Sequence, residues 1–310
     1  MPELPEVETI RRHLAPHVEG RRLERLEVLD ERWCRPLAPA EIADAVTGRT
    51  LERLGRRGKY LVMELEDDVH LMLHLRMTGN LLVARQSHTR VRFHFGAPGF
   101  RPLGEHPLRE PGPLGQCSLF YDDPRRFGTG ELALGAEQRD ALFAARLGLE
   151  PFDPEFPPQH LQRLAKGCRA PVKAFLLDQK RIAGVGNIYA DEALFRARVH
   201  PLRPAGALKR AQWEALHRGV VDALQAGIDA KGATIDDFRH PDGVYGSFQS
   251  QFLVHLREGE DCDVCGFTIR KLRAAGRGTY VCEKCQPKPR SYAASASSRR
   301  TPAASARASS

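Results

Sequence analysis

Four cysteines near the C-terminus place the strongest single constraint on how this chain can fold. Cys262 and Cys265 form one CxxC pair, Cys282 and Cys285 form a second, and sixteen residues separate the two pairs. Thiolates at this spacing are typical of a tetrahedral structural site for one Zn²⁺ ion, which we predict here. Thiol–disulfide chemistry is the alternative, but it requires a βαβ pattern beside one CxxC, and none is present.

The segment between the two pairs reads as two short strands around a Gly-containing turn. A hairpin clamped by the metal would project basic side chains that suit phosphate groups. Those side chains belong to Arg270, Lys271, Arg273 and Arg277. The alternative is that the metal only holds a small C-terminal module together.

Composition narrows the class of partner. The chain has 310 residues, a formal net charge of +8 and a sequence pI of about 9.3. A basic balance favours a polyanion, either nucleic acid or an anionic membrane surface. No apolar run approaches the roughly 18 residues of a transmembrane helix, and no signal-peptide core follows the start. We therefore expect a soluble, cytoplasmic protein that has no membrane partner.

The chain divides into three stretches and a tail, which together predict an α+β fold. Residues 2–148 alternate in strand fashion, residues 149–240 turn helical, and residues 241–286 contain the cysteine cluster. Residues 287–310 are a low-complexity basic tail that we predict to be disordered.

Two local patterns are specific enough to predict elements. Apolar residues recur at spacings of three and four from Trp213 to Ile228, so a helix is expected there, and Gly232 is a good C-terminal stop. The Pro/Gly-rich piece Ala97–Gln116 reads as a long loop between two strands.

The stretch RIAGVGNIYADEALF predicts a turn followed by a helix. Gly184 and Gly186 allow the tight turn, and Asn187 is a good N-cap. A helix start flanked by glycines exposes backbone N–H groups and favours an anion, although a plain helix–turn–helix packing joint would show the same pattern. Lys173, on the preceding helical segment, would line the same pocket or else be a solvated surface lysine.

The chain begins MPELPEVET. Removal of the methionine would expose the secondary amine of Pro2, and an α-amino group with a pKa near 8 is roughly one-tenth unprotonated at neutral pH. A neutral amine is a carbonyl nucleophile that can form a Schiff base, and Glu3 is within reach for proton transfer.

The same residues have a purely structural interpretation. Val7, Ile10 and Leu14 recur at helical spacing, so a helix should start just after Pro5. Acidic residues and proline are common at helix N-termini for reasons unrelated to catalysis.

The motifs PELPEVET, RRGKYL, HLRMTG, DPRRFG and GVGNIYADEALF, followed by the paired CxxC, occur in an order that closely resembles the formamidopyrimidine-DNA glycosylases. These enzymes are bacterial relatives of endonuclease VIII that repair oxidised bases. The resemblance spans about Pro2 to Gln286. It implies an N-terminal catalytic β-sandwich flanked by helices, a helix–two-turn–helix DNA-binding domain, and a covering loop with a C-terminal zinc-finger β-hairpin. It also implies a nucleoid-associated monomer.

By position, the resemblance implies that Pro2 attacks C1′ of the damaged nucleotide and that Glu3 protonates the opening deoxyribose. The base is released, and successive elimination on the 3′ and 5′ sides cuts the strand. The enzyme would therefore be both a glycosylase and an AP lyase.

The remaining site residues are also implied by matching positions. Lys59 matches a lysine that contacts phosphate and is assigned a proton-transfer role, and Glu6 matches a further acid. Asn187 and Arg277 match residues that clamp the same phosphates, and Lys173 matches a lysine near the lesion pocket.

An everted nucleotide leaves a gap in the stack, which flat or unbranched apolar side chains fill. Met77 and Phe127 match the family's inserted residues, and Arg125 matches the residue that faces the orphaned base. Without the family, Met77 and Phe127 would be read as core residues. His74 and His88 match contacts to the DNA backbone, or are otherwise satisfied histidines.

Three functions follow from this resemblance. The first is removal of oxidised purines, 8-oxoguanine and formamidopyrimidines, from double-stranded DNA. The second is the same chemistry with a preference for oxidised pyrimidines, because DGVYGSFQ replaces a DGKPGYFQ-like covering stretch. The third is a non-catalytic protein that only binds lesions. The PELPEVET start favours the first.

Overall fold

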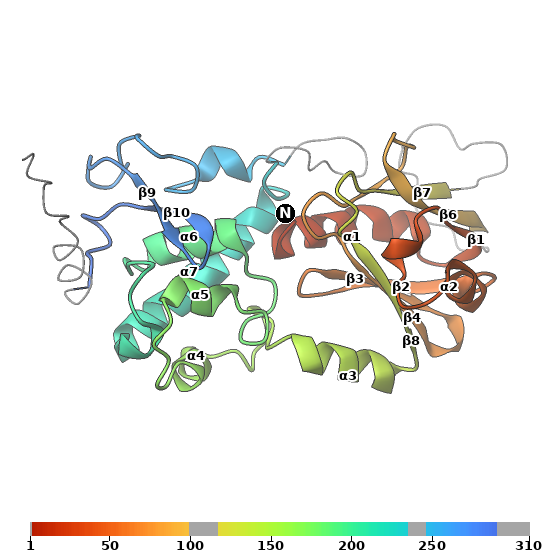
Figure 1. Ribbon diagram of the computed structural model, residues 1–310, viewed down its shortest axis with the longest axis horizontal. Helices are drawn as coiled ribbons and strands as arrows, with labels where there is room; N and C mark the ends of the chain where they lie inside the picture. Colours follow the sequence, from red (N-terminus) through yellow and green to blue (C-terminus); the bar gives the residue numbers. More distant parts are fainter. Residues whose placement is uncertain (1, 99–116, 235–245, 290–310) are drawn as a thin grey trace, which may run out of the picture.

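The computed structural model describes residues 2–98, 117–234 and 246–289. Apart from a C-terminal two-stranded hairpin, the strands lie in one half of the molecule, and the helical module and that hairpin lie in the other (Figure 1). The N-terminus lies between the two halves. The predicted disordered tail beyond residue 289 lies outside the described residues, as do most of the predicted loop 97–116 and residues 242–245 of the covering stretch. The strand before that loop continues to Pro98, so the loop starts later than predicted.

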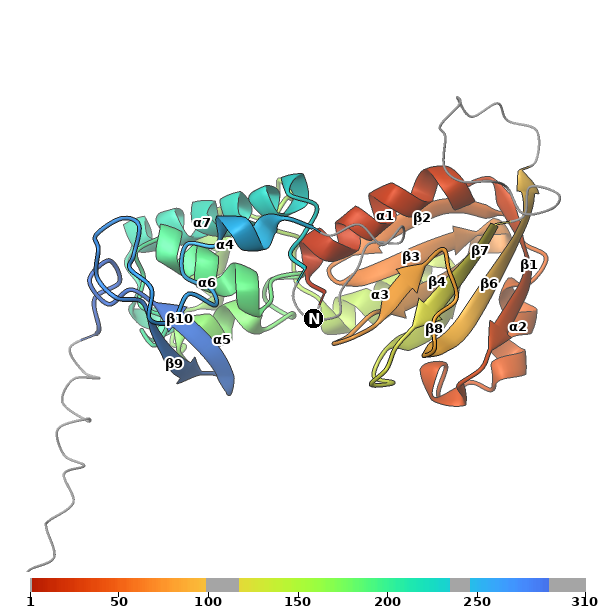
Figure 2. The same cartoon turned by 90° about the horizontal axis from the view of Figure 1, so that it is seen from above.

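The N-terminal half is a sandwich of two four-stranded antiparallel sheets, seen from above in Figure 2. The first sheet has the order β1-β6-β7-β5 and the second the order β2-β3-β4-β8. The strands are β1 (Arg21–Val28), β2 (Leu51–Arg57), β3 (Tyr60–Leu65), β4 (Val69–His74), β5 (Asn80–Leu82), β6 (Thr89–Pro98), β7 (Cys117–Asp122) and β8 (Thr129–Leu134).

Three helices accompany the sandwich: α1 (Leu4–Val18), α2 (Pro39–Val46) and α3 (Ala136–Arg146). Val7, Ile10 and Leu14 lie in the sandwich core, as their spacing predicts. Helix α1 begins at Leu4 rather than after Pro5, because proline is tolerated in the first turn, where no intrahelical donor is needed.

The helical module contains α4 (Pro158–Leu164), α5 (Val172–Leu177), α6 (Asn187–Arg196) and α7 (Arg210–Asp229). The helix predicted around Trp213 to Ile228 is confirmed as part of α7, and Gly232 beyond it has a left-handed φ of 80°. Leu4, the first residue of α1, is fully buried in the core of this module, so the N-terminus is anchored in the second half of the molecule.

The cysteine-bearing segment contains the predicted hairpin of β9 (Arg270–Ala274) and β10 (Arg277–Val281), in which Arg277 pairs with Ala274. Single-turn 3₁₀ helices complete the described structure: η1 (Glu31–Trp33), η2 (Glu66–Asp68), η3 (Ala205–Ala207) and η4 (Phe248–Gln251). The predicted α+β class, with its β-sandwich, helical domain and C-terminal hairpin, is confirmed. Among the described residues, no helix combines the length and apolarity needed to cross a bilayer.

Candidate active site

The glycine turn before α6 holds the N-terminal segment of the chain. The backbone N–H of Leu4 donates to the carbonyl of Gly184 (3.1 Å), and the N–H of Ile188 donates to Oε1 of Glu3 (3.0 Å). A Cβ at Gly186 would overlap the Glu3 carboxylate, so only glycine permits this approach. The anion predicted at the start of this helix is thus the side chain of Glu3 itself.

The N-cap prediction for Asn187 is wrong, because Gly186 is the N-cap and Asn187 is the first helical residue. Glu3 already accepts from one of the free N–H groups at this terminus, and Asn187 instead donates from Nδ2 to the carbonyl of Gly278 in the hairpin (3.1 Å). Its Oδ1 atom is buried and has no hydrogen-bond partner among the described residues.

Glu3 is only 2% exposed, and the preceding Pro2 is also buried. One oxygen of the Glu3 carboxylate is fixed by Ile188, whereas Oε2 has no hydrogen-bond partner in the described part of the chain. A buried oxygen without a partner is uncommon, because its desolvation is not offset by a hydrogen bond. This oxygen belongs to the residue next in sequence to Pro2.

Glu6 ties the N-terminal segment to the helical module. Its carboxylate accepts from the hydroxyl of Tyr189, the N–H of Ala233 and the N–H of Glu3, each at 2.8 Å. Burial raises the pKa of Glu6, and the neighbouring charge of Glu3 raises it further. Glu6 therefore positions Glu3 from one side while α6 holds it from the other.

Lys59 lies in the same charged cluster. Burial lowers the pKa of its ammonium, the nearby carboxylates of Glu3 and Glu6 oppose that shift, and the charge of Arg277 adds to it. The turn that carries Lys59 is anchored by Arg56, whose guanidinium pairs with carboxylates of α1 and of the segment that links the two halves. The structure thus brings four of the predicted site residues within electrostatic range of one another.

Lys173 is fully buried, so its interpretation as a solvated lysine is wrong. Its ammonium donates to Oδ1 of Asp191 (2.6 Å), to the Thr279 hydroxyl (2.9 Å) and to the Gly278 carbonyl (3.2 Å). Burial lowers the pKa of Lys173, and the charge of Asp191 opposes that shift. The lysine joins α5, α6 and the hairpin, and it fixes the strand on which the exposed Arg277 lies.

The predicted DNA-filling residues lie on the surface of the sandwich, so the core interpretation of Met77 and Phe127 is wrong. Met77 is 40% and Phe127 52% exposed, and the Arg125 guanidinium lies 4.8 Å from the centre of the Phe127 ring. His88 is exposed, and its Nδ1 is 3.1 Å from the Ser87 hydroxyl.

His74 is mostly buried, unlike His88. Its Nδ1 accepts from the backbone N–H of Arg76 (3.0 Å), and its ring packs edge-on against Tyr60. Burial lowers the pKa of His74 to about 3, helped by the positive charges of Arg76 and Lys59. The imidazole is therefore neutral and acts as an acceptor inside the fold.

Sequence reasoning missed three buried acids that shape these surfaces. Asp191 receives Lys173, and Glu192 accepts three consecutive backbone N–H groups, at residues 253–255, from the segment before the first cysteine pair. Asp123 holds the DPRRFG loop through the N–H of Gly128 (2.8 Å). The sequence did contain signals for these acids. Asp191 and Glu192 are adjacent acids in a largely apolar helix, and Asp123 is the first residue of a loop.

The four cysteines of the paired CxxC motifs form a compact cluster, with all four sulfurs within 4.8 Å of one another. The Sγ atoms of Cys262 and Cys285 are 3.9 Å apart, and those of Cys265 and Cys282 are 3.5 Å apart. A tetrahedron with metal–sulfur bonds of about 2.3 Å has edges of about 3.8 Å, whereas a disulfide needs about 2.05 Å. The cluster fits a tetrahedral metal and excludes disulfides within it.

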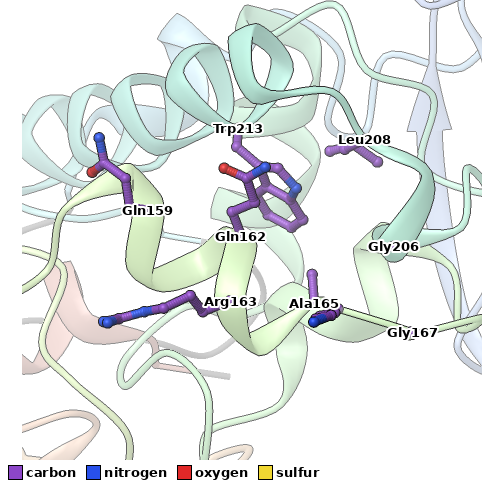
Figure 3. A pocket seen from close by; sticks show the side chains of 9 residues that line it. Gln159, Gln162, Arg163, Ala165, Gly167, Gly206, Leu208 and Trp213 are labelled. Carbon is purple, nitrogen blue, oxygen red and sulfur yellow. The ribbon is translucent and has the colours of Figure 1, made fainter.

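A hollow of about 370 Å³ opens on the helical module between α4, η3 and α7 (Figure 3). Its lining residues are Gln159, Gln162, Arg163, Ala165, Lys166, Gly167, Gly206, Leu208 and Trp213. None of them belongs to the predicted site, and the acid cluster around Glu3 lies elsewhere.

Comparison with known proteins places this fold among the base-excision repair DNA glycosylases. Three family models match the chain: the formamidopyrimidine-DNA glycosylase N-terminal domain over residues 1–130, its H2TH domain over 147–239, and the zinc finger found in FPG and IleRS over 259–288.

The chain is 42% identical to the formamidopyrimidine-DNA glycosylase of Methylococcus capsulatus, over 92% of this chain and 100% of that protein. A Lactococcus lactis FPG mutant bound to Fapy-dG-containing DNA is 32% identical with a TM-score of 0.81, over 93% of this chain and 100% of that one. Wild-type Lactococcus lactis FPG with oxidised-pyrimidine DNA is 31% identical with a TM-score of 0.80, at the same coverage. The chain belongs to the formamidopyrimidine-DNA glycosylase family, whose members are base-excision repair glycosylases and AP lyases.

The buried neutral His74 makes stability depend on pH. Its pKa is about 3 in the folded chain against about 6.5 when unfolded, so folding stability is lost as pH falls below the unfolded value. Between pH 7 and pH 5 the loss from this group should be about 2 kcal/mol. The check is urea unfolding at both pH values for the native chain and for His74→Asn, whose amide oxygen can still accept from Arg76. An unchanged pH dependence in the variant would contradict this assignment.

Proposed function

We propose that this enzyme removes oxidised purines, 8-oxoguanine and formamidopyrimidines, from double-stranded DNA and then cleaves the abasic site that remains. The observation that carries the proposal is the buried carboxylate of Glu3, held by α6 through one oxygen while the other has no partner in the described structure. This carboxylate is adjacent in sequence to Pro2, whose amine becomes a nucleophile once Met1 is removed.

The proposed reaction begins with attack of the Pro2 nitrogen on C1′ of the damaged nucleotide. A C1′–N bond forms, the glycosidic bond breaks, and the base leaves with a proton. Glu3 protonates the ring oxygen as the deoxyribose opens, which leaves an iminium link between Pro2 and the sugar. Loss of a proton from C2′ then expels the 3′ phosphate, and a second elimination expels the 5′ phosphate.

We propose that Lys59, Asn187 and Arg277 surround the phosphates next to the lesion. Lys59 and Arg277 are basic side chains, and Nδ2 of Asn187 already contacts the hairpin backbone one residue from Arg277. Cationic and amide groups around a phosphate both bind it and stabilise it as a leaving group. Glu6 supports this site from within the fold through its contacts to Tyr189 of α6 and to the N–H of Ala233 after α7.

DNA binding beyond the site is assigned to the exposed residues of the sandwich loops. Met77 and Phe127 would fill the gap left by the everted nucleotide, Arg125 would face the orphaned base, and His88 would contact the backbone. Lys173 and His74 are buried, so we propose that they serve the DNA by fixing the hairpin and the loop after β4.

The functional units of the proposed enzyme are a catalytic domain of residues 2–148, a DNA-binding helical domain of residues 149–240, and a finger within 241–286, acting as a monomer. We assign the metal as one Zn²⁺ ion, because four thiolates in a tetrahedral cluster are its preferred structural site.

Borohydride trapping tests the chemistry directly. A duplex containing 8-oxoguanine opposite cytosine should give a covalent adduct with the native enzyme, because borohydride reduces the iminium link. Mass spectrometry should map the adduct to Pro2. Pro2→Gly should slow trapping, and Glu3→Gln should abolish base release while DNA binding is retained.

Retained methionine supplies the matched control, because it blocks the Pro2 amine without removing any side chain from the site. An adduct on another residue would contradict the nucleophile assignment. An adduct with an oxidised pyrimidine but not with 8-oxoguanine would overturn the purine preference. Tight lesion binding without any adduct, on abasic DNA as well, would leave only a recognition protein.

The metal cluster generates a separate prediction. Cys265→Ser should release the zinc and unfold the hairpin, because a structural zinc site contributes directly to folding. Affinity for lesion duplex should then fall at least tenfold while the melting transition of the sandwich persists. Zinc content by elemental analysis and binding by fluorescence anisotropy check this, with Cys34→Ser as the control outside the cluster. A zinc-free variant with native affinity would contradict the role given to the finger.

A further inference from the structure

Two loops of the sandwich carry the proposed DNA-filling residues, and the hydroxyl of Thr78 joins them. This hydroxyl, next to Met77, donates to Oδ1 of Asp123 at 2.6 Å. It also accepts a long hydrogen bond (3.4 Å) from the N–H of Arg125. Asp123 opens the loop that carries Phe127 and is only 1% exposed. A short hydrogen bond to a buried carboxylate is among the stronger contacts that a neutral side chain makes.

Asp123 also organises its own loop. Its Oδ2 accepts from the N–H of Gly128 (2.8 Å), and its Oδ1 accepts from the N–H of Arg125 (3.2 Å). A single carboxylate therefore fixes the backbone on both sides of Phe127 and, through Thr78, the loop of Met77.

Both loops rest on the same side chain, the fully buried Tyr121 of β7. A Cβ at Gly79 or at Gly128 would overlap the Tyr121 hydroxyl, so each loop needs a glycine where it passes that hydroxyl. These glycines follow closely on Met77 and Phe127. The two loops thus both pack against Tyr121 and are both hydrogen-bonded to the carboxylate of Asp123.

The middle residue of the second loop, Arg126, is held by an ion pair. Arg126 has a left-handed φ of 60° and pairs with the carboxylate of Asp30, with Nη2 and Oδ1 2.7 Å apart. Because Arg126 is held from the side of β1, its neighbours Arg125 and Phe127 both face outward and stack on each other.

From these contacts we infer that Asp123 and Thr78 are positioning residues that lock Met77 and Phe127 into one preassembled wedge, which enters the DNA as a unit. This inference rests on the proposed function, in which those two side chains fill the gap of an everted nucleotide. A wedge that is ordered before binding avoids the entropy cost of ordering two loops separately on the DNA.

A double-mutant cycle tests the inference. The probe is a duplex with a tetrahydrofuran abasic analogue opposite 2-aminopurine, whose fluorescence reports both binding and insertion. Thr78→Val removes the hydroxyl that donates to Asp123 and that accepts the longer hydrogen bond from the N–H of Arg125. It should weaken binding about tenfold in the native background, as expected for one hydrogen bond to a charged group. It should have little effect when Met77→Ala and Phe127→Ala are both present, because no wedge remains to position.

Two variants serve as controls. Thr129→Val removes a buried hydroxyl without a partner in the described residues, close to the same loop, and should leave binding unchanged. Thr78→Ser keeps the donor and should restore native binding. Thermal melting of each variant confirms that the sandwich is folded.

The outcomes separate the inference from the proposed function. An equal effect of Thr78→Val with and without the two wedge residues, or no effect in either background, would overturn the inference while leaving the wedge itself intact. Native binding and fluorescence in the Met77→Ala, Phe127→Ala variant would instead overturn the wedge assignment within the proposed function.

Discussion

The organisation of the site depends on the hydrogen bond from the N–H of Ile188 to the carboxylate of Glu3. A helix N-terminus carries free donors and a positive dipole end, so it attracts an anion. Here the first residues of the chain supply that anion, 185 positions away in sequence. Leu4 buries itself in the helical core beside this contact, so the N-terminus belongs to both halves of the molecule.

Other contacts across the molecule serve the same arrangement. Glu6 fixes α1 against α6 and the end of α7, and Lys173 fixes the hairpin against α5 and α6. Glu6 and Lys173 are both buried titratable groups. Burying such a group costs desolvation free energy unless well-placed hydrogen-bond partners offset it. The positions of the three proposed functional surfaces, which are the N-terminal acid, the hairpin arginine and the sandwich loops, therefore depend on interior polar contacts as well as on apolar packing.

The sequence predicted the units of the fold because their signals are local. The cysteine spacing, the strand alternation within residues 2–148 and the helical repeat after Trp213 each depend on neighbours within a few residues. It could not predict that Asn187 contacts the hairpin or that Lys173 is buried, because those partners lie far away in sequence. That Glu3, Lys59 and Arg277 belong to one site was predicted only from the family resemblance. The three residues are far apart in sequence, so only tertiary contacts bring them together.

The most direct test of this account is the rate of 8-oxoguanine release by Gly186→Ala in a single turnover. An added Cβ would displace the Glu3 carboxylate, and misplacement of a catalytic group by about 1 Å costs about a hundredfold in rate. The account predicts a loss of that size with native DNA affinity, and a native rate for Gly55→Ala, which meets only flexible side chains on β2 and β3. A native rate for Gly186→Ala would contradict the claim that α6 holds the catalytic acid.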